Sequence, residues 1–328
     1  MEHLQECLDS LKNQTFRDFE TIVVDNGSKD GSQTFLKQVF PWVRLIELDR
    51  NIGFAGGNVA GYRHSSGSLI VTLNNDTVVD KTWLEELVRV ADQSSRNGMV
   101  ASRICSYFDN DRIDSLGMKI CLDGMSRGCA RGRKFSSLKS LPDQILMPSA
   151  CAALYRRQMI EEVGFFDEAF FAYCEDSDLG LRARIAGWDA KIAINAVVYH
   201  KYSATAGSFS PFKLYLVERN HFWAVLKTFP PLLLLLLPLT TLYRYVFQAL
   251  VIMRGTGSGN MIRQTSDAKA CLLAVLRGLW HGLCNPWPML RKRREFFKNC
   301  RIGSSGLLRL ILKHRMNFSE LLDAGNGP

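Results

Sequence analysis

The first 92 residues alternate between helical and extended hydrophobic patterns. Apolar residues recur at spacings of three and four over residues 4–11, which predicts an amphipathic helix close to the start of the chain. Short apolar runs typical of buried strands lie at 21–24, 43–48 and 68–73. Helical patterns follow them at 34–40, up to residue 64, and at 83–92. Because strands and helices alternate at short intervals, we expect an α/β fold with a mostly parallel sheet and helices on both faces.

Beyond residue 92 the pattern is less regular. Residues 103–145 hold several glycines and arginines, and we expect loops and short strands there that cover the site. Further elements are predicted as a strand at 150–155, a helix at 157–163, a helix ending at residue 186 and a strand at 190–199.

Each of the first three predicted strands ends in a polar or glycine-rich loop. The loops read DNGS after residue 24, NIGFAGGN from residue 51 and NNDT from residue 74. In open α/β sheets, ligands bind outside the carboxyl ends of the strands. Three such loops at one edge therefore predict a binding site more strongly than any one of them alone.

The first two loops have chemistry that suits a nucleotide. The carboxylate of Asp25 can accept a hydrogen bond from a base or a ribose, although DNGS also suits a plain turn or helix cap. The glycines of the second loop let backbone approach a ligand and expose helix N–H groups, although a tight turn uses them too. Their order lacks the GxGxxG spacing of a dinucleotide fingerprint.

Two residues are candidate metal ligands. Asp76 in NNDT can hold a hard divalent cation beside a diphosphate, because Mg²⁺ commonly uses only one or two carboxylates with phosphates and water. His200 ends a predicted strand and can complete such a site. The alternatives are a surface turn for Asp76 and an ordinary core residue for His200.

An acidic cluster opens the predicted helix that ends at residue 186. It consists of Glu175, Asp176 and Asp178. The helix dipole favours acids at this position without any catalytic role. Five aromatic residues precede the cluster, however, and a carboxylate walled by aromatic rings can act as a general base with a raised pKa.

The composition changes at residue 230. Six leucines at 232–237 stand between prolines, and Arg244 is the single charge from residue 229 to 253. These 25 residues are nominally long enough to cross a bilayer, which takes about 20. Pro238 and Arg244 weaken a single clean span, so we expect a peripheral, monotopic or re-entrant segment, with a buried helical subdomain as the alternative. A linker at 255–259, a second apolar stretch at 270–283 and the basic run 291–294 follow.

The charge distribution separates the two parts of the 328-residue chain. The net charge is +9, and residues 254–328 hold 13 Lys and Arg against 4 Asp and Glu, whereas the first 253 residues hold 28 of each sign. This argues against a nucleic-acid-coating protein and favours a basic tail on anionic lipid. Nine scattered cysteines without a CxxC pair, and a start without a signal-peptide pattern, favour a body in the cytosol, at the cytoplasmic face of the membrane.

Taken together and in order, the motifs resemble glycosyltransferase family 2, and within it the rhamnosyltransferase-like bacterial members that build O-antigen, capsule or cell-wall glycans. The resemblance rests on VVDNGSKDGS, NIGFAGGNVAG, LNNDT, GFFDEAFFAYCEDSDLGLRARIAGW and VVYH. It implies a catalytic domain of the GT-A type over residues 1–225, a nucleotide-diphospho-sugar transferase fold. Residues 226–328 are then expected to form a helical, apolar and basic region that associates with the membrane.

The resemblance implies a metal-dependent transfer that inverts the configuration of rhamnose or a hexose. The sugar would pass from a dTDP- or UDP-sugar to a hydroxyl of a lipid-linked or polysaccharide acceptor. The nucleotide would be bound by Asp25, Asn51, Gly53, Gly56 and Asn74. Mg²⁺ or Mn²⁺ would be bound by Asp76 and His200, with Asn74 in place of the first acid of the family's DxD motif. Glu175 and Asp176 match the family's ED motif, with Asp176 as the base, and Asp178 and Arg182 would contact the acceptor or the diphosphate.

One feature of the family is not found in this sequence. The family normally has an apolar strand and a Thr-Tyr-Asn-like loop before the helix that begins here near Leu4, and that strand would lie beside residues 21–24. Because every downstream motif is intact, we expect that the start codon is assigned too late; a truncated chain, or a non-catalytic or degenerate nucleotide-sugar-binding protein, is the alternative. A sugar nucleotidyltransferase is another reading, although its basic, glycine-rich activating loop is not found near the N-terminus.

Overall fold

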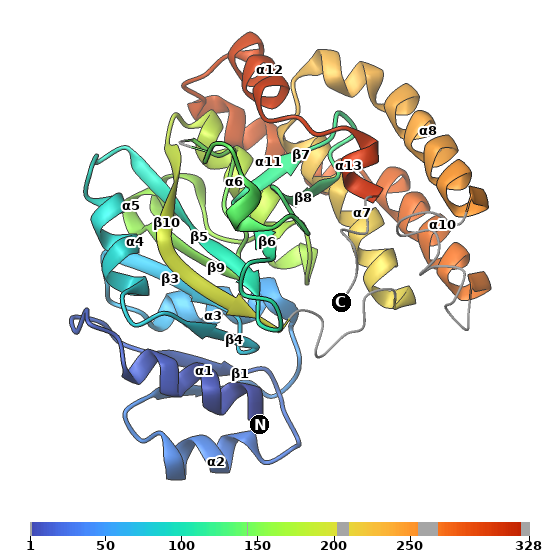
Figure 1. Ribbon diagram of the computed structural model, residues 1–328. Coiled ribbons are helices and arrows are strands. Elements are labelled where there is room, and N and C mark those ends of the chain that lie inside the picture. The colour runs from blue at the N-terminus through green and yellow to red at the C-terminus, as the bar shows by residue number, and fades with distance from the viewer. Residues whose placement is uncertain (1, 143, 202–209, 255–267, 323–328) are drawn as a thin grey trace.

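The computed structural model describes residues 2–142, 144–201, 210–254 and 268–322 (Figure 1). The elements up to residue 91 are α1 (Glu2–Lys12), β1 (Ile22–Asp25), α2 (Ser32–Val39), β2 (Arg44–Glu47), α3 (Gly53–His64), β3 (Leu69–Leu73), β4 (Thr77–Val79) and α4 (Trp83–Ala91). Those up to residue 200 are β5 (Asn97–Ser106), β6 (Ile113–Ser115), β7 (Met118–Ile120), β8 (Ser126–Gly128), β9 (Ala152–Arg156), α5 (Arg157–Val163), α6 (Glu175–Ile185) and β10 (Asp189–His200). The remaining helices are α7 (Pro211–Thr228), α8 (Pro231–Arg254), α10 (Ala268–Cys284), α11 (Trp287–Phe296), α12 (Ser304–Lys313) and α13 (Phe318–Leu322).

The main sheet is mixed, and the prediction of a mostly parallel sheet is wrong. Its strand order is β3-β9-β5-β10-β4, with β6 also paired to β5. Only β5 and β10 pair in parallel, whereas β9, β4 and β6 run antiparallel to their neighbours. An apolar run indicates that a strand is buried but not in which direction it runs. The chain reaches β9 through segment 107–151, which contains the short strands β6, β7 and β8, and not through the helical crossover that a parallel strand needs.

Strand directions explain why the NNDT loop and His200 share one edge of the main sheet. Because β9 is antiparallel to both β3 and β5, and β10 is parallel to β5, the strands β3, β5 and β10 all run the same way. The end of β3, the end of β10 and the start of β9 therefore lie at one edge of the sheet. The central strand β5 is absent from the predicted elements, since Asn97, Gly98 and Arg103 interrupt its apolar pattern.

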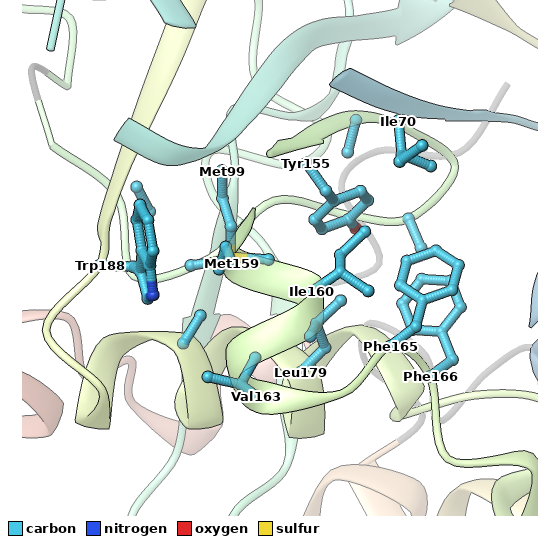
Figure 2. Packing of buried hydrophobic residues seen from close by; sticks show 14 of the residues in the cluster. Ile70, Met99, Tyr155, Met159, Ile160, Val163, Phe165, Phe166, Leu179 and Trp188 are labelled. Atoms are coloured by element: carbon cyan, nitrogen blue, oxygen red, sulfur yellow. The ribbon is translucent and has the colours of Figure 1, made fainter. Parts of the chain in front are cut away.

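Helices cover both faces of the sheet, as predicted. Successive residues of β5 alternate, so that Met99 and Ala101 face one core and Val100 faces the other. On the first face, α5 and α6 pack their apolar side chains against Met99 and Tyr155 (Figure 2). On the second face, α1, α2 and α4 contribute Leu8, Leu36 and Trp83 among others.

The parallel pair β1–β2 is not hydrogen-bonded to the main sheet. Val23 of β1 and Leu45 of β2 nevertheless pack in the same apolar cluster as Leu69 and Val71 of β3. In the part of the chain that the structure describes, the second edge of β1 and the outer edge of β3 have no partner strand.

The C-terminal helices form a separate group beside the sheet (Figure 1). The boundary expected at residue 225 falls inside α7, which packs against both α6 and α10. Helix α8 continues past Pro238, and a stripe of it at helical spacing is buried: Leu233, Leu237, Thr241 and Arg244. The linker expected at 255–259 lies outside the described residues.

Helix α8 is the described helix that is long and apolar enough to cross a membrane, judged by length and composition alone. The qualifying segment is Pro231–Val251, and only 17% of its most apolar window is buried, so it is not the core helix of a subdomain. Arg244 is itself 1% exposed and pairs with Asp123 and, at 2.7 Å, with Glu218. The buried stripe of α8, which includes Leu233, Leu237 and Arg244, thus packs against the body of the protein, while other apolar side chains such as Leu235 and Leu239 are exposed.

Candidate active site

Asp76 and His200 lie together at the carboxyl edge of the sheet. Asp76 is in the tight turn between β3 and β4, and His200 is the last residue of β10, where it pairs with Thr77. The imidazole Nε2 lies 3.3 Å from Asp76 Oδ1, and both residues are 7% exposed. The sequence predicted both residues as metal ligands, and the fold brings them into contact.

A second carboxylate, which the sequence analysis missed, holds the other side of the imidazole. His200 Nδ1 lies 2.8 Å from Oδ2 of Asp114 in β6, and Arg131 pairs with Oδ1 of the same carboxylate at 3.2 Å. No local pattern marks Asp114, because the pairing of β6 with β5 brings together residues 86 apart in sequence.

The charges in this cluster compensate one another. Burial alone would raise the pKa of Asp76, but the hydrogen bond and charge of His200 outweigh it, so the pKa lies below its ordinary 3.8. Burial opposes charge on His200 as well, yet Cys151, Asp114 and Asp76 around it raise the pKa of the imidazole above its ordinary 6.5. The carboxylate of Asp76 is therefore held in its charged form.

Asn74, Asp76 and His200 suit a divalent cation that is bound by only a few protein ligands. Asn74 Oδ1 is a buried oxygen without a hydrogen-bond partner, and Asp76 Oδ1 faces the imidazole of His200, so a hard cation would be bound by Asn74 and by the charged Asp76 carboxylate. Among the described residues no group of three His, Cys, Asp or Glu side chains is placed to hold a metal. A cation here would complete its coordination with phosphate oxygens and water.

Glu175 and Asp176 form an acidic pair at the start of α6, in which Glu175 is buried and Asp176 is half-buried. Asp176 Oδ1 accepts the Ser177 N–H at 2.7 Å, and Oδ2 accepts the Ala150 N–H at 3.5 Å. Glu175 is 5% exposed and its Oε2 has no hydrogen-bond partner. Within the described ranges no Lys or Arg side chain pairs with either carboxylate.

Burial without a compensating cation raises the pKa of both acids, whereas the pKa of Asp76 is lowered. Desolvation raises the pKa of Asp176 above its ordinary 3.8. Desolvation also raises the pKa of Glu175 well above 4.5, and the neighbouring charge of Asp176 adds to the shift. A carboxylate of this kind is a better proton acceptor than an exposed one, which suits a general base.

Asp178 and Arg182 pair with each other and are both buried. Asp178 is fully buried and its Oδ2 receives hydrogen bonds from Arg182 and from Lys227, both at 2.9 Å. The Arg182 guanidinium also donates to the carbonyls of Val163, Gly164 and Phe165. The predicted contact of these two residues with acceptor or diphosphate stays a prediction, and their observed contacts hold the loop before α6.

Asp25 ends β1 and closes a turn. Its Oδ2 accepts the Ser28 N–H at 3.1 Å and the Gln33 side-chain N–H at 2.6 Å. Burial opposes the charge, but these hydrogen bonds outweigh it and lower the pKa of Asp25. The turn that the sequence offered as an alternative is therefore formed, and a role in binding a base or ribose stays a prediction.

Asn26, which the sequence analysis did not single out, joins the first loop to the second. Its Oδ1 accepts the Ile52 N–H at 2.8 Å, and its Nδ2 donates to the Gly53 carbonyl at 2.9 Å. Asn51 is exposed, and its Oδ1 accepts the Gly53 N–H at 2.8 Å. The predicted residue Gly56 lies in the first turn of α3, buried against Ile52.

Gly53 shows why this loop requires glycine. Its φ is +83°, a conformation that side chains disfavour. A Cβ at this position would lie 2.3 Å from the carbonyl oxygen of Phe171. The Ala55 N–H donates to that same oxygen at 3.0 Å, so the second loop touches the segment that leads into the acidic pair.

Backbone hydrogen bonds also link the metal side of the edge to the acidic pair. The Asn74 N–H donates to the Cys151 carbonyl at 2.8 Å, and the preceding residue, Ala150, donates its N–H to Asp176. Thr72 of β3 donates to the Ala150 carbonyl at 2.8 Å. The start of β9 thus lies between the Asp76 turn and the start of α6, and all the predicted loops belong to one continuous site.

Comparison with solved structures identifies the fold class. The model resembles the Staphylococcus aureus TarS fragment 1–349 with a TM-score of 0.52 at 13% identity, over 95% of this chain and 87% of that one. It resembles the mannosyltransferase PcManGT from Pyrobaculum calidifontis, solved with GDP-Man and Mn²⁺, with a TM-score of 0.51 at 14% identity, over 99% and 80% of the two chains. At these identities the likeness shows the fold, which is of the GT-A kind.

Sequence comparison gives the family. Residues 2–164 match the family described as glycosyl transferase family 2. The chain is 29% identical to the O-antigen biosynthesis protein RfbC of Myxococcus xanthus over 218 residues. It is 27% identical to the N-acetylglucosaminyl-diphospho-decaprenol L-rhamnosyltransferase of Mycobacterium tuberculosis over 226 residues. The chain belongs to glycosyltransferase family 2.

The relatives differ greatly in how much of their length is matched. Each match takes in 62% of this chain but 16% of RfbC, 23% of the protein y4gI of Sinorhizobium fredii and 74% of the mycobacterial enzyme. The chain spans less than a quarter of RfbC and of y4gI, so the activities of these whole relatives are not transferred by the matches.

Proposed function

We propose that the protein is an inverting, metal-dependent glycosyltransferase that moves a sugar from a nucleotide diphosphate to a hydroxyl group of a membrane-linked glycan. The observation that carries the proposal is the pair of opposed carboxylate environments at one sheet edge. Asp76 is kept charged by His200, and Asp176 is kept basic by burial without a cation. A metal-assisted leaving group and a base are the two elements that such a transfer needs.

The chain's own residues then have separate tasks. Asp25, Asn51 and the glycines of the second loop would bind the nucleotide at the start of α3. Asp76 and His200 would hold Mg²⁺ or Mn²⁺, which when bound neutralises the charge that develops on the departing diphosphate.

Asp176 would take the proton from the acceptor hydroxyl. The new C–O bond then forms on the face opposite the leaving diphosphate, and the configuration at the anomeric carbon inverts. Glu175, beside it, would stay protonated and limit the charge of the pair.

The names of two relatives support the proposed sugar and acceptor classes. The mycobacterial relative is named for rhamnosyl transfer to a diphospho-decaprenol, and RfbC for O-antigen synthesis. We therefore propose a dTDP-rhamnose or UDP-hexose donor, a lipid-linked or polysaccharide acceptor and a role in cell-surface polysaccharide synthesis.

Binding of nucleotide sugars tests this proposal directly. The full chain is screened by thermal shift with dTDP-, UDP- and GDP-sugars, with and without Mn²⁺, and release of free nucleotide is followed. We expect stabilisation by one donor class that requires Mn²⁺. Indifference to every nucleotide sugar, with and without the metal, would contradict the proposal.

We also propose that α8 and α10 lie on the cytoplasmic face of the plasma membrane. Most large apolar side chains that are exposed in the described ranges are on these helices, including Leu235, Leu239, Leu276 and Trp280. Arg277 of α10 is exposed beside them. The basic run is only partly available to lipid, because Lys292 pairs with Asp167 at 2.7 Å while Arg291 and Arg294 are exposed.

Flotation with liposomes of varied anionic content tests the membrane proposal. The exchange of Leu235 and Leu239 for Glu should abolish flotation, because both side chains are more than half exposed on α8. Leu141→Glu, at an exposed position outside these helices, serves as the control. Unchanged flotation of the double variant, or indifference to anionic lipid, would contradict the apolar and the electrostatic parts respectively.

A further inference from the structure

The segment that leads into the acidic pair has an unusual backbone. Phe171, Tyr173 and Cys174 have φ values of +65°, +70° and +68°, and among described residues other than glycine only Ala130 shares this sign. Such conformations are disfavoured for residues with a Cβ, so the surrounding structure has to hold them in place. Cys174 is the N-cap of α6, and the geometry of this segment therefore fixes where Asp176 points.

One side chain of α7 holds this segment. Asn220 is fully buried, and its Nδ2 lies 2.8 Å from each of three backbone oxygens, those of Phe170, Ala172 and Tyr173. Arg219 donates from Nε to Asn220 Oδ1 at 2.9 Å, which fixes the orientation of the amide. A reversed amide would place its oxygen against three carbonyl oxygens.

The same segment reaches the nucleotide loop. The carbonyl of Phe171 accepts the Ala55 N–H in the first turn of α3, next to Gly53. The segment 170–174 thus connects the start of α3 with the start of α6, and the amide of Asn220 lies against its middle.

We propose that Asn220 is a positioning residue for the base. It acts through the segment 170–174, which it keeps in a conformation that presents Asp176 to the acceptor and buttresses the start of α3. This inference rests on the proposed function for its kinetic consequence, but the placement of the segment is testable without any activity.

The first test is structural and uses Asn220→Ala in the full chain. Loss of the amide releases the three carbonyls, so the Ala55 N–H should exchange faster with deuterium. The matched control is Asn97→Ala, since Asn97 is 1% exposed and donates to the Val90 carbonyl at 2.8 Å, away from this segment. Equal exchange at Ala55 in both variants would overturn the inference.

The second test is kinetic. A displacement of the base by about 1 Å can cost about 10²-fold in rate, so kcat of the Asn220→Ala variant should fall by about that factor. Its Mn²⁺ affinity should stay that of the wild type, because Asp76 and His200 do not touch the segment. A parallel loss of Mn²⁺ affinity, or an equal fall of kcat in Asn97→Ala, would show a general structural effect and overturn the inference.

A milder variant covers the case in which Asn220→Ala does not fold. Arg219→Gln removes the hydrogen bonds of Arg219 to Asn220 and to the Phe170 carbonyl and leaves the amide in place. It should accelerate exchange at Ala55 and lower kcat in the same direction by a smaller factor. If the wild type transfers no sugar, the proposed function fails, while the exchange experiment still decides the role of Asn220.

Discussion

Two acids at the sheet edge, Asp76 and Glu175, are buried to a similar extent, but their pKa values shift in opposite directions. Asp76 is 7% exposed and lies against an imidazole, which lowers its pKa. Glu175 is 5% exposed and, with Asp176, has no cationic partner, so burial raises the pKa of both. Burial alone therefore raises the pKa of either carboxyl group, and a neighbouring positive charge decides whether the pKa ends above or below its ordinary value. Such a divergence separates a cation ligand from a proton acceptor.

The largest effect is expected for Asp176→Asn, which removes the base and leaves the metal side intact. Because general-base catalysis contributes about 10²–10⁴-fold, kcat should fall by that amount while donor binding by thermal shift persists. Asp92→Asn, an exposed acid at the end of α4, is the control. Loss of donor binding with unchanged transfer per bound donor would reverse the assignment of the two sites.

A smaller loss is expected for Asp76→Asn, which removes the charged ligand and leaves the base intact. Stabilisation of the leaving group by a metal is worth several kcal/mol, so transfer at a fixed Mn²⁺ concentration should fall by about 10²–10³-fold. Electron paramagnetic resonance titration with Mn²⁺ should show the loss of the bound ion. Unaltered Mn²⁺ binding would mean that this carboxylate is not a ligand.

Asp114→Asn tests whether the contact between Asp114 and His200 Nδ1 contributes to Mn²⁺ affinity. Residues that orient a metal-binding histidine typically contribute about 10–100-fold in metal affinity, and the Mn²⁺ dissociation constant should rise by such a factor. At saturating Mn²⁺, kcat should return close to that of the wild type. Asp109→Asn, a more exposed acid nearby, is the matched control and should leave the Mn²⁺ affinity unchanged.

The pH dependence of kcat gives the smallest effect. Asp176 accepts a proton only when it is ionised, and its raised pKa means that activity rises with pH up to a value above 3.8. Acidification by one unit below that pKa should lower kcat by at most about tenfold. The profile is recorded with saturating donor and Mn²⁺ while circular dichroism monitors folding. An acid limb at or below 3.8 would contradict the raised pKa.

Much of the site could be predicted because its residues stand next to strand and helix ends. Asp76 and His200 follow apolar runs, and the acidic cluster opens a helix, so local patterns located them. The contacts that other side chains make with these residues and with the segment before α6 could not be predicted. Asp114 reaches His200 across 86 residues, and Asn220 reaches the Tyr173 carbonyl across 47. Both depend on the packing of elements whose partners no local pattern specifies.

The layers and most of the larger elements were predictable, but the central strand β5 and the strand directions were not. The alternating pattern located β1, β2 and β3, and helices on both faces followed from it. The pattern does not record direction, so the antiparallel entry of β9 between β3 and β5 was missed. Arg244 was taken as a weakness of an apolar helix, whereas its pairing with Asp123 and Glu218 attaches that helix to the body.

Helix α7 makes the catalytic body and the apolar helices inseparable as modules. Its residue Asn220 serves the catalytic segment, while Glu218, two positions earlier, pairs with Arg244 of α8. A chimera that joined this sheet to the membrane region of another family member would have to carry the whole of α7, together with the partners of both residues.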